Sequence, residues 1–99
     1  MNKSEIIDNF ADRHYDEEIL RADGLDKACV GWTDSWNGQH RNIRLVYDVG
    51  EVVKIFQERD GMTYEDAVEF YDYNVAGAYM GESTPIFINS IEDTLEYIM

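Results

Sequence analysis

The last forty residues, 60–99, contain no lysine or arginine, so no ion pair of their own can hold them together. They carry nine of the 21 acidic residues, whereas residues 1–59 carry the other twelve together with all eight cations. The formal charge is therefore −9 in residues 60–99 and −4 in residues 1–59. Because no cation neutralises the second part from within, its negative potential extends outward. This potential favours basic protein partners and disfavours nucleic acid and anionic membranes.

The composition predicts one folded domain over residues 1–99. A hydrophobic fraction of 44% is too high for a disordered acidic tail, and 99 residues leave room for one core. A domain this small buries a modest share of its surface, so a homodimer is an open alternative. The lone Cys29 cannot form an intramolecular disulfide, and no apolar run is long enough for a signal core or a membrane span. We therefore expect a cytoplasmic protein.

The first half has the pattern of a helix followed by a β-hairpin. Ser4 is the expected N-cap of the helix, whose apolar stripe includes Ile7 and Phe10. Residues 28–33 and 42–47 are rich in β-branched and aromatic residues, which predicts two antiparallel strands. The loop expected between them, residues 34–41, contains the turn dipeptide Asn37-Gly38.

The second half has the pattern of two helices, a short strand and a last helix. Asp48 is expected to cap a helix over residues 49–58, and Thr63 with Asp66 resembles a capping box that opens a helix from Tyr64 to about Tyr79. Residues 86–88 are the expected third strand, and Ser90 precedes the last helix. The order αββααβα predicts an α+β fold with a small three-stranded, mostly antiparallel sheet packed against helices.

The helix that begins at Tyr64 is expected to expose a row of acidic side chains. At 100° per residue, Glu65, Glu69 and Asp72 fall on one side, which we call the acidic ridge, and Asp66 and Tyr73 flank it. Like charges at this spacing cost a few tenths of a kcal/mol each, and no cation in the helix relieves them. Two interpretations remain open: a solvated face that maintains solubility, or a docking surface for a basic partner.

Two further positions are candidates for binding. Trp36 lies in the polar loop 34–41, where it would be an interface anchor or would fold back onto the hairpin, whereas Trp32 is expected in the core. Asn74 falls on the apolar side of its helix, where its amide needs partners, and the loop 81–85 is the expected source. An alternative small-ligand site would therefore consist of Asn74, Glu82 and Thr84.

Motifs that would identify an enzyme or a nucleic-acid-binding protein are absent from the sequence. His14, His40 and Cys29 lack the spacing of a metal site, no stretch matches an EF-hand loop, and there is neither a phosphate-binding glycine loop nor a nucleophile elbow. A basic stripe for DNA or RNA is also lacking. We therefore expect no catalytic residue, metal or cofactor. A hydrolase that uses clustered carboxylates and a divalent ion is the weakest alternative.

Three segments resemble an uncharacterised family of small proteins encoded by phages and bacteria: DGMTYEDAVEF (residues 60–70), NVAGAY (74–79) and GESTP (81–85). The resemblance implies a phage or mobile-element setting and no particular activity. Together with the charge, it favours a non-enzymatic module that inhibits a basic host protein acting on nucleic acid, in defence or transcription, as a DNA mimic. A metabolite-binding protein is the alternative.

Overall fold

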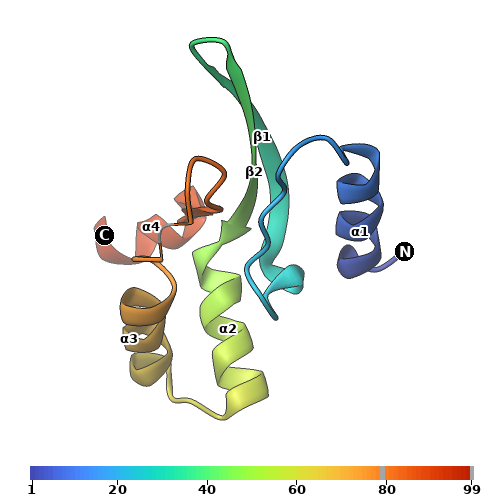
Figure 1. Ribbon diagram of the computed structural model, residues 1–99. Coiled ribbons are helices and arrows are strands. Elements are labelled where there is room, and N and C mark those ends of the chain that lie inside the picture. The colour runs from blue at the N-terminus through green and yellow to red at the C-terminus, as the bar shows by residue number, and fades with distance from the viewer. Residues whose placement is uncertain (79, 99) are drawn as a thin grey trace.

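The structure, a computed structural model, describes residues 1–78 and 80–98. It combines helices with one three-stranded sheet (Figure 1), which confirms the expected α+β class. The order of helices and strands is also as expected, with a short 3-10 helix, η1, added before the first strand. The elements are α1 (Lys3–Arg13), η1 (Asp26–Ala28), β1 (Cys29–Asn37), β2 (His40–Asp48), α2 (Val49–Asp60), α3 (Tyr64–Asn74), β3 (Ile86–Ile88) and α4 (Ile91–Ile98).

The sheet has the strand order β1-β2-β3 and mixed pairing. The β1/β2 hairpin is antiparallel, and the short β3 adds to β2 in parallel, so the sheet is mostly antiparallel as expected. Both hairpin strands run further than expected, since Asn37 pairs with His40 and most of the predicted loop 34–41 is strand. The turn is therefore Gly38-Gln39, because Gly38 at φ 65° suits the first central position of a two-residue turn.

One hydrophobic core joins the sheet to α1, α2 and α3. Its central residue is Tyr47 of β2, which is fully buried and stacks on Phe87 of β3 with ring centroids 5.5 Å apart. The Tyr47 hydroxyl accepts a hydrogen bond of 3.0 Å from the Ala22 N–H, and burial raises the pKa of this phenol. The chain between α1 and β1 is thereby fixed to the sheet. The buried cluster comprises Ile7, Leu25, Ala28, Cys29, Leu45, Tyr47, Val52, Val53, Phe56 and Ala67.

The helix starts agree with the sequence at three of four positions. Asp48 accepts a hydrogen bond from the Glu51 N–H, and Thr63 accepts one from the Asp66 N–H. Ser90 likewise accepts one from the N–H three residues ahead. The expected cap Ser4 is wrong, because the helix begins at Lys3 and Asn2 is the residue whose side chain caps it, at 2.8 Å from the Glu5 N–H.

Two further expectations, about the end of α3 and about the position of Trp32, are also wrong. Helix α3 ends at Asn74, because the N–H groups of both Val75 and Ala76 turn back to the Tyr71 carbonyl; the expected end, Tyr79, lies outside the described residues. Trp32 is 48% exposed and not in the core. It lies on the edge strand β1 and packs against the Phe10 ring of α1, with centroids 4.8 Å apart.

Candidate partner-binding face

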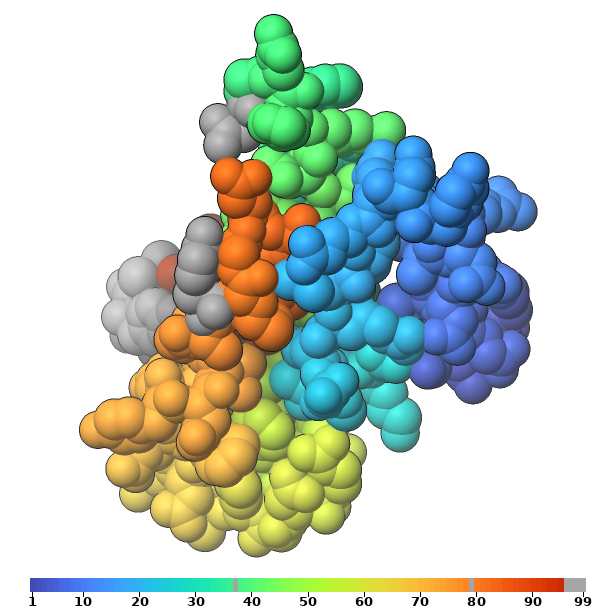
Figure 2. Space-filling model, viewed as in Figure 1, coloured from blue at the N-terminus to red at the C-terminus, as the bar shows by residue number. Residues whose placement is uncertain are grey.

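Helix α3 is held against the rest of the protein by its inner face. Ala67 is completely buried, and Phe70 meets Phe56 of α2 edge to face, with ring centroids 5.0 Å apart. Tyr71 makes a second edge-to-face contact, 5.7 Å from the ring of Phe87. The contacts of Ala67, Phe70 and Tyr71 along one side fix the orientation of the helix about its own axis. The opposite side of α3 therefore faces solvent in a defined orientation; the helix lies at the lower left in Figure 1, and its residues form the lower left surface in Figure 2.

The three carboxylates of the acidic ridge are all exposed on this side. Together with Tyr64, Val68 and Tyr73 they line a shallow hollow of about 510 Å³. Tyr64 is 64% exposed and Tyr73 is 79% exposed. Within residues 1–78 and 80–98, no lysine or arginine forms an ion pair with a carboxylate of the ridge.

Chemically, this face can accept hydrogen bonds and can stack. Free carboxylates accept charge-assisted hydrogen bonds from lysine and arginine, and tyrosine rings attract a guanidinium placed over them. Among the described residues, the lining of the hollow includes no cation that could bind a phosphate, whereas its carboxylates can pair with lysine and arginine side chains.

The ends of α3 place its acidic residues in different electrostatic environments. Asp66 lies in the first turn, where the positive end of the helix dipole stabilises a carboxylate. Asp72 lies in the last turn, where the dipole disfavours an anion, and no basic residue occupies that turn. The negative charge of Asp72 therefore lowers the stability of the isolated helix.

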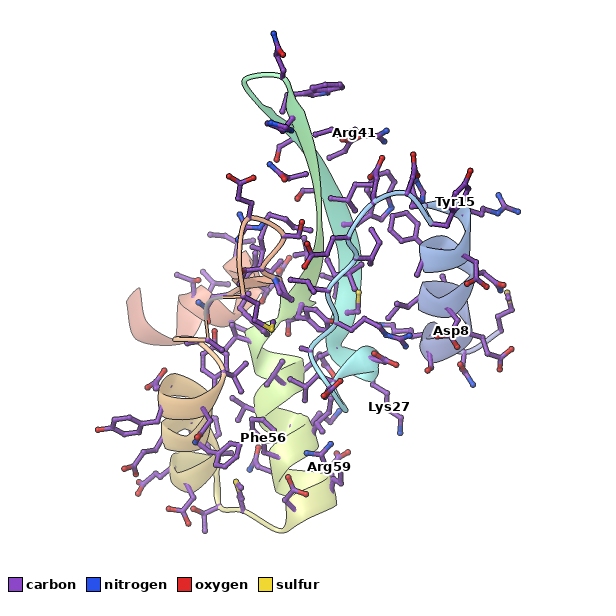
Figure 3. All side chains as sticks on the ribbon, in the orientation of Figure 1. Asp8, Tyr15, Lys27, Arg41, Phe56 and Arg59 are labelled. Carbon is purple, nitrogen blue, oxygen red and sulfur yellow. The ribbon has the colours of Figure 1, made fainter. Side chains whose placement is uncertain are left out.

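Trp36 lies at the other end of the molecule. It is 69% exposed near the tip of the hairpin, whereas α3 lies at the opposite end of the fold (Figure 1). Arg41, labelled in Figure 3, stiffens this hairpin through two hydrogen bonds of 2.7 Å to Asp34, and these bonds lower the pKa of the Asp34 carboxyl. The structure therefore does not place Trp36 in one compact patch with the acidic ridge, and its role as an interface anchor stays a prediction.

The expected surroundings of Asn74 are wrong. Asn74 is exposed, and its amide donates a 3.2 Å hydrogen bond to the Phe70 carbonyl of its own helix instead of to the loop 81–85. Thr84 closes that loop itself, since its hydroxyl donates to the Gly81 carbonyl and accepts from the Met80 N–H. Glu82 does not face Asn74 across a common hollow but lines one beside residues 16–18. No hydrogen bond in the described part of the chain joins these residues into a common site.

The hollow beside Glu82 is a feature that the sequence did not indicate. It has a volume of about 390 Å³ and is also lined by Asp16, Glu17, Glu18 and Arg41. One oxygen of Glu17 is buried there with no hydrogen-bond partner among the described residues, and the other lies 3.4 Å from Arg41. Acidic residues from two distant segments meet here, and no local spacing pattern could have revealed it. Where the structure is described, it contains no group of three His, Cys, Asp or Glu residues able to hold a metal ion.

Comparison of the chain with models of known protein families, with curated proteins and with solved structures gives no match.

Proposed function

We propose that this protein is a small non-enzymatic module that binds a basic surface of another protein through the outer face of α3. The observation that carries this proposal is the acidic ridge itself. Three carboxylates without a partner cation among the described residues lie in line, between two exposed tyrosines, on a helix whose opposite side is fixed in the core.

The charge distribution supports the same function. The charge bias is not confined to α3, because residues 60–99 contain nine acids and no cation, and a large field of one sign is suited to steering a partner. A single-sign surface accelerates association with an oppositely charged partner. Exposed tyrosines beside the carboxylates are typical of residues that contribute strongly to protein interfaces.

We further propose that the partner is a host protein whose basic surface binds nucleic acid, in defence or transcription, and that the module inhibits it. Proteins with such surfaces expose the clustered lysine and arginine that a carboxylate row complements. The resemblance of residues 60–70, 74–79 and 81–85 to small phage and bacterial proteins favours this setting. Inhibition would follow because a surface covered by α3 is closed to the nucleic acid.

The experiment is to capture partners of the tagged protein from host lysate at near-physiological salt and to identify them by mass spectrometry. We expect one stoichiometric, basic, nucleic-acid-handling protein that is lost when the salt concentration rises, because screening weakens charge pairing. Recovery of the tagged protein alone, or of a partner insensitive to salt, would contradict the proposal.

A further inference from the structure

A second surface, at the opposite edge of the sheet from β3, is independent of α3. Strand β1 is the edge strand, so on the side away from β2 it has no neighbouring strand within the described residues. An edge strand presents backbone N–H and C=O groups that can pair with another extended chain. The nine residues of β1 include one charged side chain, Asp34, and it is already bonded to Arg41.

An apolar groove of about 240 Å³ lies between β1 and α1. Phe10 and Leu45 are among the residues that line it, and three further apolar residues of its lining are exposed: Ile6 at 51%, Val30 at 54% and Trp32 at 48%. Exposed apolar side chains gathered around one groove indicate a binding surface.

Val30 and Trp32 bring this groove to the edge of β1. Both residues line it, and Trp32 pairs with Leu45 of β2, which lines it as well. The open backbone edge and the apolar groove thus occur side by side at the same few residues of β1. An edge strand next to a helix, with an apolar groove between them, is the arrangement in which extended peptides add to a sheet.

The charge and shape of the groove determine what can occupy it. Lys3 is its one charged lining residue in a molecule of net charge −13, so a basic segment would be drawn to the acidic helices instead. A second copy of the chain would bring another charge of −13 and would be repelled by the first. A short apolar segment carries no such charge.

We propose that the groove between α1 and β1 binds an extended apolar peptide segment of a partner protein, which adds as a strand to the edge of β1. Alternate apolar side chains of the segment enter the groove, as the two-residue period of a strand requires. A carboxylate of the segment lies near Lys3, whose ammonium group already donates one hydrogen bond to the Lys27 carbonyl and has further N–H groups to donate.

The test begins with a displayed library of random eight-residue peptides selected on the whole protein. We expect enriched peptides that alternate apolar residues and carry one acidic group. The best of them, made synthetically, should lose at least tenfold in affinity on Val30→Asp and retain it on Ser35→Asp, a matched change at an exposed residue further along the same strand. N-methylation of alternate peptide amides should abolish binding in one register only, because only every second amide faces β1.

Ile6→Asp gives a second blocking variant, on the α1 side of the groove, because Ile6 is more than half exposed and its replacement does not disturb the core. Circular dichroism of each variant verifies folding before binding is measured. Three results would each overturn the proposal: no apolar peptide enriched, equal affinity for wild type and both blocking variants, or a concentration-dependent dimer in sedimentation that Val30→Asp abolishes. The last result would assign the edge to a second copy.

Discussion

Asp72→Lys is expected to stabilise the protein while it weakens partner binding. Asp72 is exposed in the last turn of α3, where the helix dipole disfavours an anion, and it lies three residues from Glu69. Lysine at this position would favour the dipole and would pair with Glu69 instead of repelling it. The variant thus separates the contribution of Asp72 to the fold from its contribution to the partner-binding face.

The expected gain follows from the position of Asp72. Reversing an exposed charge in a terminal turn changes the dipole interaction by about 1 kcal/mol, and the pair with Glu69 adds a few tenths. For a domain of this size, a gain of about 1 kcal/mol raises the melting temperature by about 4 to 8 °C. The matched control is Asp66→Lys, which makes the same charge change in the first turn and should destabilise the protein by about 0.5 to 1 kcal/mol.

Thermal and urea unfolding followed by circular dichroism measure both variants, at low salt and at 1 M salt. We expect shifts of opposite sign at low salt that shrink at 1 M, where the Debye length is about 3 Å. If both variants shift stability in the same direction, net charge and not position on α3 governs it, and the reasoning is refuted. A stabilising substitution that costs affinity would indicate that Asp72 is retained for binding.

Two further predictions concern the fold. Tyr47→Phe should lower the free energy of unfolding by about 1 to 2 kcal/mol, because it leaves the Ala22 N–H without its acceptor, whereas Tyr15→Phe on the surface should have no effect in the same urea titration. The pKa of Asp34 is lowered by Arg41, so this pair contributes stability above the unfolded pKa of about 4 that is lost as the pH falls through the folded value. Between pH 5 and pH 2, Asp34→Asn should therefore lose less stability than wild type; an equal loss would contradict this assignment.

Local signals predicted most of the fold. The capping side chains of Asp48 and Thr63 fixed the starts of α2 and α3, since each is read from a few adjacent residues. The alternation of Ile43, Leu45 and Tyr47, all buried in the structure, follows from the period of a strand. The acidic ridge was predictable for the same reason, because helical periodicity alone determines which residues of α3 share a face.

What depends on distant contacts could not be predicted. Trp32 looks like a core residue in its strand, yet its exposure depends on β1 being an edge strand, which the strand itself does not reveal. The end of α3 at Asn74 removed the expected burial of that amide. The sequence allowed Trp36 and the acidic ridge to bind the same partner. The chain topology instead places them at opposite ends of the fold.

The most direct test of the proposed function compares dissociation constants of the captured partner for three proteins: wild type, Glu65→Lys/Glu69→Lys/Asp72→Lys, and Asp12→Lys/Asp23→Lys/Glu58→Lys. The last variant makes the same charge change at exposed acidic residues outside α3. We predict that reversal of the acidic ridge abolishes binding while circular dichroism shows an intact fold, and that the control weakens binding only slightly. Equal affinity of the two variants would contradict a binding face on α3 and would assign the interaction to net charge or to another surface.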